Sequence, residues 1–296
     1  MSRAVGAKSL RGIFAPVVTP FVKGSEDLDL TGMRANIQAH LKDGLAGIVL
    51  TGSTGEAALL GEEERMALAR AAREEVPADR WLIVGTGSES TRQCVARCRA
   101  AKEAGADAVL VVAPHYYSAA MSHEALDAHY RRVADESPLP VLLYNIPKYM
   151  HFALPAELVG TLARHENVIG IKDSSGDLEM LKGFLRAQSE TFTVVTGNGA
   201  GVQAAFEAGA RGGILAVSLF AASLALEVLD AHAKGDTARA AAAQARLTPM
   251  AQVIVAKLGV PGVKGAMDHV GRVGGTPRLP LLPLTASQRA EVAAVL

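Results

Sequence analysis

The stretch Val168-Ile-Gly-Ile-Lys-Asp-Ser-Ser175 is a short apolar run that ends in a lysine and three polar residues. Its β-branched side chains predict a buried strand. Because side chains alternate along a strand, Val168, Gly170 and Lys172 share one face of it. Lysine is almost never fully buried without a partner. Two interpretations therefore stay open: Lys172 bends into solvent at the strand end, or it has a function at the mouth of a buried strand.

Similar apolar runs alternate with alanine-rich amphipathic stretches along most of the 296 residues. The runs are continuous rather than alternating, which is typical of parallel strands covered on both faces. We expect strands at residues 13–21, 47–52, 81–87, 108–114, 141–147, 168–174, 192–198 and 212–218. We expect helices at residues 31–43, 62–75, 91–104, 122–137, 155–164, 178–188, 201–208 and 221–233. This alternation predicts an α/β protein with the (β/α)8 TIM-barrel fold.

A doubly wound open sheet is the main structural alternative. Its dinucleotide-binding form is disfavoured because no G-x-G-x-x-G motif follows the first expected strand.

The pattern changes after Gly235. Residues 236–258 predict one long alanine-rich helix, Gly- and Pro-rich stretches follow, and a short helix near residues 287–295 ends the sequence. We therefore expect a barrel over residues 1–235 and a C-terminal helical extension over residues 236–296 that packs on the barrel.

Charge and hydropathy argue against two classes of partner. Lys plus Arg and Asp plus Glu number 30 each, and no long run of one sign occurs, which argues against binding to nucleic acid or to an anionic membrane. The longest uncharged run, residues 212–226, is shorter than the ~18 residues that span a bilayer. No export signal precedes Gly12. We expect a soluble cytoplasmic protein.

The cysteines and histidines indicate neither a disulfide nor a metal site. Cys94 and Cys98 lie four residues apart on an expected helix, where adjacent turns do not suit a disulfide and two ligands do not make a zinc site. We expect them to be packing residues in a reducing compartment. The histidines form no H-E-x-x-H or H-x-H motif, so we expect no bound metal.

Lys172 gains a plausible role from the expected fold. In TIM barrels the carboxyl ends of the strands and the loops after them carry the active site, and Lys172 ends the sixth expected strand. A neutral lysine attacks ketones, and burial favours the neutral form by lowering the pKa of the amine. The resulting imine is an electron sink, so it permits a carbon–carbon bond to form or break at the neighbouring carbon.

Three further strand ends carry candidate groups. The loop Gly52-Ser-Thr-Gly55 offers N–H groups and hydroxyls to a carboxylate, or is only a turn that caps the next helix. Tyr144 is either a proton shuttle or an ordinary buried tyrosine. The loop Gly197-Asn-Gly-Ala-Gly201 lies where barrels often bind phosphate, and Arg211 is the cation near it in sequence.

Five motifs, in this order and spacing, together resemble one family. They are Pro16-Val-Val-Thr-Pro20, Gly52-Ser-Thr-Gly-Glu56, Gly85-Thr-Gly87, Tyr144-Asn-Ile-Pro147 and Ile169-Gly-Ile-Lys-Asp-Ser174. The resemblance is to the dihydrodipicolinate synthase / N-acetylneuraminate lyase superfamily of pyruvate-dependent class I aldolases, and it covers residues 12–284. It implies a lyase that works through a lysine imine, with no metal or nucleotide cofactor.

The resemblance also implies a role for each candidate residue. Lys172 would form the imine with the ketone carbon of pyruvate or of a larger 2-oxo acid. Tyr144 would relay protons while the imine forms and while the carbon–carbon bond is made or broken. Ser53 and Thr54 would hold the substrate carboxylate, and the Ser53 hydroxyl would join the proton relay. The other substrate-binding positions would be Gly52, Gly55, Tyr116, Tyr149, Gly197 and Ile214.

One more implied role concerns the assembly of the protein. In this family a tyrosine from the loop at Pro114-His-Tyr-Tyr117 usually reaches into the site of a neighbouring subunit. Tyr117 is the expected match, and Tyr116 is the alternative. The resemblance thus implies a homo-oligomer, commonly a dimer of dimers.

The second substrate is less well defined by the resemblance. Dihydrodipicolinate synthases usually carry an arginine two residues after Tyr-Asn-x-Pro, whereas Tyr149 occupies that position here. Lys148 would replace it only as a point charge, because lysine lacks the bidentate fork of arginine. Residues 115–122, 137–140 and 259–264, together with paired glycines near residues 212 and 274, look closer to 4-hydroxy-2-oxoglutarate aldolases.

We therefore expect cleavage of a hydroxylated 2-oxo acid of the 4-hydroxy-2-oxoglutarate type to pyruvate and an aldehyde. The first alternative is 4-hydroxy-tetrahydrodipicolinate (dihydrodipicolinate) synthase, which condenses pyruvate with aspartate semialdehyde. Further alternatives are a 2-oxo-3-deoxy sugar-acid aldolase or dehydratase and a non-catalytic paralogue that binds a carboxylate ligand.

Overall fold

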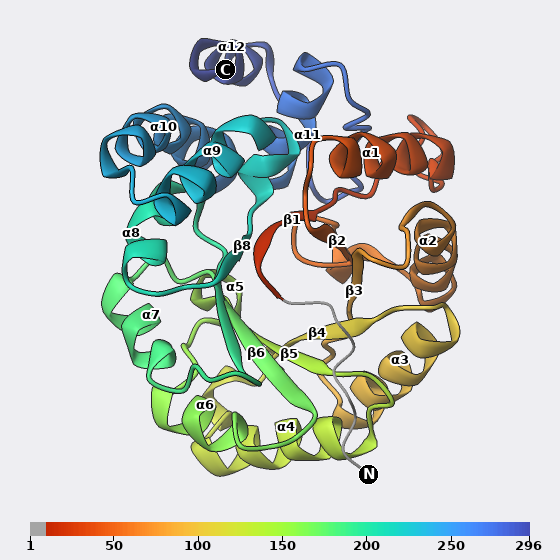
Figure 1. Cartoon of the computed structure of the whole chain (residues 1–296). Coiled ribbons are helices and arrows are strands. Elements are labelled where there is room, and N and C mark those ends of the chain that lie inside the picture. The colour runs from red at the N-terminus through yellow and green to blue at the C-terminus, as the bar shows by residue number, and fades with distance from the viewer. Residues whose placement is uncertain (1–9) are drawn as a thin grey trace.

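The computed structural model describes residues 10–296, which form a closed parallel barrel in the strand order β1 to β8 (Figure 1). The strands are β1 Gly12–Pro16, β2 Gly47–Leu50, β3 Trp81–Gly85, β4 Ala108–Val112, β5 Val141–Asn145, β6 Val168–Asp173, β7 Thr193–Thr196 and β8 Gly212–Ile214. Strand β1 pairs with both β2 and β8, which closes the sheet. The predicted TIM barrel is confirmed, and the open sheet is excluded.

A ring of helices surrounds the barrel (Figure 1). The helices are α1 Leu30–Lys42, α2 Glu62–Glu75, α3 Thr91–Glu103, α4 His123–Glu136, α6 Ala156–Leu162, α7 Leu178–Leu185, α8 Val202–Glu207 and α9 Ala222–Ala233, with a short α5 at Pro147–Met150. Short 3-10 turns are η1 Ala57–Leu59, η2 Ser118–Ala120, η3 Gly199–Gly201 and η4 Ala216–Leu219. Side chains that accept hydrogen bonds from first-turn N–H groups fix several starts, such as Asp29 for α1 and Ser122 for α4.

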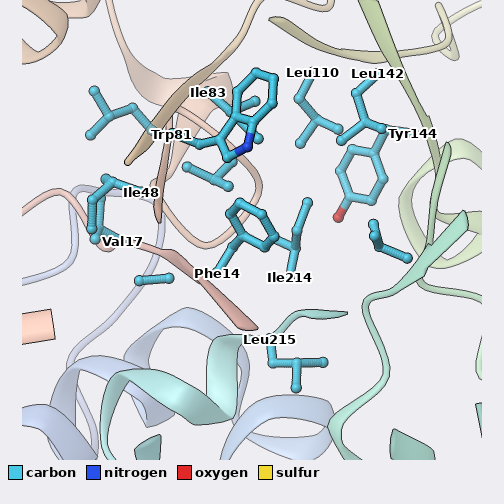
Figure 2. Close-up of a cluster of buried hydrophobic side chains, with 14 of the residues drawn as sticks. Phe14, Val17, Ile48, Trp81, Ile83, Leu110, Leu142, Tyr144, Ile214 and Leu215 are labelled. Carbon is cyan, nitrogen blue, oxygen red and sulfur yellow. The ribbon is translucent and has the colours of Figure 1, made fainter. Parts of the chain in front are cut away.

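The interior of the barrel is filled by large apolar side chains from successive strands. Figure 2 shows Phe14 of β1, Trp81 of β3 and Ile214 of β8 facing one another there, with Tyr144 of β5 among them. The hydroxyl of Tyr144 points into this interior rather than toward the outer helices (Figure 2). The barrel core therefore fixes the position of Tyr144 from several sides.

Strand β1 is shorter than the sequence predicts. It ends at Pro16, and Phe21 instead forms isolated bridges with Leu28 and Thr276. The chain after Pro16 thus leaves the barrel to contact the C-terminal part of the protein. Apolar composition alone does not distinguish a barrel strand from a buried segment of this kind.

The C-terminal extension contains α10 Thr237–Met250, the π-helix η5 Ala251–Lys257, α11 Gly259–His269 and α12 Ala286–Val295. The prediction of one long helix over 236–258 is wrong in detail, because a π-helical segment follows Met250. Pro249 lacks the N–H group that a regular helix would use, and π-helical turns, which are rare, occur mostly within α-helices.

The sequence predicts no helix at Gly259–His269, yet α11 forms there. Pro261 lies in its first turn, where the missing N–H group has no intrahelical partner to lose. A Cβ atom at Gly262 would clash with the carbonyl oxygen of Ile254, so this glycine allows α11 to pack closely against η5. Glycine and proline here serve close packing and helix initiation rather than a loop.

The described residues contain no helix with both the length and the apolar character needed to cross a bilayer.

Candidate active site

A cavity of about 410 Å³ opens at the carboxyl ends of the barrel strands. One part of its wall comes from strand ends and the loops after them, and the other part comes from α5, η5 and α11. The strand-end part includes Ser53, Thr54, Tyr144, Lys172, Ser174, Gly197, Asn198 and Ile214. The helical part includes Lys148, Tyr149, Ala251, Val255, Ala256, Gly259, Val260 and Val263.

Lys172 lies in this cavity and is only 6% exposed. It pairs in register with Tyr144 on the adjacent strand β5, and its Nζ lies 4.2 Å from the centroid of the Tyr144 ring. The interpretation of Lys172 as a lysine that bends into solvent is thereby excluded. A buried amine that opens only into a cavity is placed to react with a ligand inside it.

Tyr144 connects Lys172 to the loop after β2. The Tyr144 hydroxyl lies 3.4 Å from Ser53 Oγ, and either oxygen is able to donate. Thr54 also lines the cavity, so this loop presents two hydroxyls to it. The structure brings together Lys172, Tyr144 and Ser53 from three separate strand ends, as a proton relay beside an imine would require.

Gly52 and Gly55 shape this loop and do not line the cavity. The Gly55 N–H donates to the Gly52 carbonyl at 3.0 Å, and the Ala57 N–H donates to the same oxygen at 3.3 Å. Both glycines therefore belong to the turn that presents Ser53 and Thr54, rather than to the cavity wall.

Gly197 lies next to Lys172, where there is no room for a side chain. A Cβ atom at this position would clash with Ser174 Oγ and would lie 2.9 Å from Lys172 Cε. The absence of a side chain at Gly197 thus leaves space for the lysine stem. Ile214 lies across the barrel from β5, is 1% exposed and lines the same cavity.

Asn145 and Asp173 follow Tyr144 and Lys172 in their strands, and sequence analysis gave them no role. Asn145 Nδ2 donates to Asp173 Oδ1 at 2.8 Å, and Asn145 Oδ1 accepts from the Leu154 N–H at 2.9 Å. The Ser175 hydroxyl donates to Asp173 Oδ2 at 2.8 Å. Burial raises the pKa of the Asp173 carboxyl, while the hydrogen bonds from Asn145 and Ser175 oppose that rise. This buried network joins the two strand ends that carry the lysine and the tyrosine.

The helical side of the cavity carries a cation at its rim. Lys148 is exposed, and its Nζ donates to the Ala256 carbonyl of η5 at 3.0 Å. Tyr149 is 41% exposed. The pKa of its hydroxyl is raised, mainly by partial burial and to a lesser extent by the nearby Tyr144. Among the described residues that line the cavity, Lys148 and Lys172 are the basic side chains.

Two predicted site residues lie away from this cavity. Tyr116 and Tyr117 are 77% and 70% exposed, and their rings meet edge to face with centroids 5.0 Å apart. The backbone N–H of Tyr116 donates to Glu89 Oε2 at 2.8 Å, which fixes the start of their loop. Within one chain, neither tyrosine reaches Lys172.

The position of Arg211 does not support the hypothesis that the Gly197–Gly201 loop binds phosphate. That arginine directly precedes β8, at the opposite end of the barrel from the loop after β7, and donates to the Ser189 carbonyl. The Asn198 side chain accepts from the Ala200 N–H at 3.1 Å, so it caps η3. The cavity residues of η5 and α11 were not predicted as site residues, because short apolar side chains carry no chemical signature.

The fold and this site define a class I aldolase or lyase that acts through a lysine imine. Residues 9–296 match the model of the Dihydrodipicolinate synthetase family. The chain belongs to this family, as the resemblance implies.

Two curated relatives illustrate the match. The 4-hydroxy-tetrahydrodipicolinate synthase of Exiguobacterium sp. is 32% identical over 281 residues, covering 95% of this chain and 95% of the relative. The enzyme of the same name from Methanoculleus marisnigri is 33% identical over 287 residues, covering 96% of this chain and 98% of the relative. These names favour the first alternative above over the 4-hydroxy-2-oxoglutarate aldolase.

Solved structures agree with this assignment. A dihydrodipicolinate synthase from Bacillus anthracis superposes with a TM-score of 0.92 at 30% identity, covering 97% of each chain. YagE, a prophage protein of the dihydrodipicolinic acid synthase family from E. coli K12 in complex with pyruvate, superposes with a TM-score of 0.91 at 32% identity, again covering 97% of each chain. The chain is therefore a pyruvate-dependent class I aldolase or lyase of this family.

Proposed function

We propose that the protein joins pyruvate, held as an imine on Lys172, to an aldehyde that carries a carboxylate of its own. The observation that carries this proposal is the placement of Lys172, Tyr144 and Ser53 in one cavity, with the Tyr144 hydroxyl 3.4 Å from Ser53 Oγ. The first candidate for the aldehyde is aspartate semialdehyde, which would make the reaction that of a 4-hydroxy-tetrahydrodipicolinate synthase. The names of the relatives support this candidate.

The proposed reaction begins with attack of the neutral Lys172 amine on the ketone carbon of pyruvate. The carbinolamine then loses its hydroxyl as water, with the proton supplied through the Tyr144 hydroxyl. The protonated imine withdraws electrons, so a proton leaves C3 and an enamine forms. The enamine carbon attacks the aldehyde carbon, and the new alkoxide takes a proton. In the synthase reaction the amino group of the bound aldehyde would then displace Lys172, whereas in a simple aldolase water would hydrolyse the imine.

The pyruvate carboxylate would bind at Ser53 and Thr54. Both residues line the cavity on the loop that follows β2, and hydroxyls and free N–H groups in such a turn are suitable partners for a carboxylate. This placement would leave C3 of pyruvate facing the helical side of the cavity, where the second substrate would enter.

A second candidate is the reverse type of reaction, cleavage of 4-hydroxy-2-oxoglutarate to pyruvate and glyoxylate. It is favoured by Tyr149, which occupies the position where the synthases usually carry an arginine. In both candidates the non-pyruvate half bears a carboxylate, and Lys148 is the cation at that end of the cavity. The apolar side chains of Val255 and Val260 offer few partners to the hydroxyl groups of a sugar acid.

The central test is reductive trapping. Borohydride added with pyruvate should attach a reduced pyruvate adduct to Lys172, located by peptide mass spectrometry. Lys172→Ala should abolish the adduct and lower turnover by more than about 10³-fold. Lys148→Met is the matched control, because it removes another cavity lysine and should leave the adduct intact. An adduct that persists in Lys172→Ala, or none in the wild-type protein, would refute the imine.

A substrate panel then separates the candidates. Pyruvate consumption with aspartate semialdehyde supports the synthase, and pyruvate release from 4-hydroxy-2-oxoglutarate supports the aldolase. A protein that binds 2-oxo acids without exchanging the C3 protons of pyruvate into heavy water would instead be the non-catalytic paralogue.

We also propose that the protein is a homo-oligomer, with a tyrosine of the loop after β4 completing the site of a neighbouring subunit. The exposure of Tyr116 and Tyr117 supports this proposal, because large exposed aromatic side chains are typical of interfaces. Light scattering gives the oligomeric state. If Tyr117 is the shared residue, mixed oligomers of Tyr117→Phe and Lys172→Ala subunits should regain activity that neither variant has alone.

A further inference from the structure

A second buried lysine, Lys264, joins the C-terminal extension to the loop that carries Ser53 and Thr54. Lys264 belongs to α11, and its side chain is 2% exposed. Its Nζ lies 2.5 Å from Oε1 of Glu56, whose side chain is 0% exposed. The contact is a close ion pair between two buried side chains. A fully buried pair of this kind lies outside the proposed reaction, because neither residue lines the cavity.

The other contacts of the pair tie it to the backbone. Lys264 Nζ donates to the Thr19 carbonyl at 2.8 Å and to the Thr276 carbonyl at 3.0 Å. The second carboxylate oxygen of Glu56 accepts from the Arg278 N–H at 2.9 Å. The pair therefore holds three segments together: the chain after β1, the turn after β2, and the C-terminal extension.

Glu56 closes the turn that presents the two hydroxyls. Its φ angle of 55° lies in the left-handed region, which is uncommon for a residue other than glycine. The Glu56 N–H donates to the Ser53 carbonyl at 3.2 Å, and the Thr19 hydroxyl donates to the Gly55 carbonyl at 2.7 Å. An unusual backbone conformation of this kind persists when surrounding contacts fix it, and the Lys264 ion pair is one of those contacts.

Both partners lie next to the cavity wall in sequence. Glu56 is two residues beyond Thr54, and Lys264 directly follows Val263, which lines the cavity from the helical side. We call the strand-end part of the cavity wall, where pyruvate would bind at Ser53 and Thr54, the pyruvate side, and the part formed by α5, η5 and α11 the helical side. The ion pair thus connects the pyruvate side to the helical side without lining the cavity itself. A buried ion pair is weak evidence for a stability role, since apolar replacements of such pairs are often neutral.

We propose that Glu56 and Lys264 are positioning residues that hold the Ser53–Thr54 turn in the conformation that binds the carboxylate of pyruvate, so that the C-terminal extension is part of the active site. This inference rests on the proposed function, because it takes pyruvate as the ligand of that turn. It assigns to the pair an effect on pyruvate binding rather than on the chemical step at Lys172.

The test uses the full-length protein and pyruvate alone. Loss of C3 protons from pyruvate in heavy water, followed by NMR, gives a half-saturating concentration and a maximal rate without a second substrate. Glu56→Gln, Lys264→Met and the double variant should each raise the half-saturating concentration about tenfold, with a change in maximal rate below about threefold. The single variants should also melt earlier, because each leaves one buried charge unpaired.

The double variant keeps the inference testable if a single variant fails to fold. It removes both charges, so its melting temperature should return toward that of the wild-type protein while the half-saturating concentration stays raised. Asp43→Asn is the matched control, since it breaks the 2.5 Å ion pair of Asp43 with Arg272, another link between the extension and the barrel. This control should leave pyruvate saturation unchanged.

Suppose that the wild-type protein exchanges the C3 protons of pyruvate and forms the borohydride adduct. Two results would then overturn this inference and leave the proposed function standing. One is a double variant with wild-type pyruvate saturation. The other is an Asp43→Asn variant whose half-saturating concentration rises as much as that of the double variant. Absence of both exchange and adduct in the wild-type protein overturns the proposed function, and this inference with it.

Discussion

The two sides of the cavity are built in different ways. On the pyruvate side, Tyr144 and Lys172 lie in register on neighbouring strands, and Asn145 and Asp173 join the ends of these strands by a buried hydrogen bond. On the helical side, Lys148 is exposed and is held by one hydrogen bond to the π-helix η5. We expect from this comparison that the barrel strands fix the imine chemistry, while the cavity walls formed by α5, η5 and α11 select the second substrate.

The largest expected difference between the two sides concerns their tyrosines. Tyr144→Phe keeps the ring beside Lys172 but removes the hydroxyl that lies 3.4 Å from Ser53 Oγ. Loss of a positioned proton-transfer group typically costs 10²–10⁴-fold, so we expect turnover to fall about 10²-fold or more. Steady-state kinetics and the rate of borohydride trapping measure this effect.

Tyr149→Phe is the matched control on the helical side. Tyr149 is 41% exposed and its hydroxyl lies outside the proposed relay, so we expect turnover to change by less than about threefold. Equal losses in the two variants would contradict the assignment of proton transfer to Tyr144 alone.

A smaller effect is expected for the cation of the helical side. For an aldehyde that bears a carboxylate, Lys148→Met should lower kcat/KM on the order of 30-fold, because a hydrogen bond to a charged group contributes about 2 kcal/mol. An uncharged aldehyde of the same length should be affected by less than about threefold. Lys148→Arg should restore most of the preference, since it keeps the charge.

The measurement is kcat/KM for both aldehydes with each variant, at fixed saturating pyruvate. Equal losses for the charged and uncharged aldehydes would show that Lys148 shapes the cavity through its contact with Ala256 rather than by recognising a carboxylate. The borohydride adduct at Lys172 should form in all of these variants.

The difference between the two sides of the cavity also explains which parts of the site could be predicted from the sequence alone. The pyruvate side rests on apolar strands that end in reactive residues, a pattern that places Lys172 and Tyr144 at one end of a barrel. The helical side rests on Val255 and Val263, whose side chains look like any packing residue. The Gly- and Pro-containing segment at Gly259–His269 did not indicate a helix, so Lys264 had no predicted partner. Its pairing with Glu56 depends on tertiary packing between distant segments.

Two buried histidines outside the cavity should have the smallest effect on turnover, so they separate stability from catalysis. Burial, and then the charge of Arg272, lowers the pKa of His40 to about 3, and burial lowers the pKa of His129 to about 4, against an opposing effect of Glu89. In the unfolded chain both pKa values return to about 6.5. Below pH 6.5 the unfolded state therefore binds protons that the folded state does not, so stability is lost as pH falls.

Between pH 7 and pH 5 each buried histidine should lower the free energy of unfolding by about 2 kcal/mol. Urea unfolding of the wild-type protein, His40→Gln and His129→Gln at the two pH values measures this loss, which should be smaller by that amount in each variant. Since no described residue of the cavity wall is a histidine, turnover per folded molecule should follow the same pH profile in all three proteins. A changed profile in either variant would mean that the outer helices act on the pyruvate side of the cavity, and the separation between the two sides would then be incomplete.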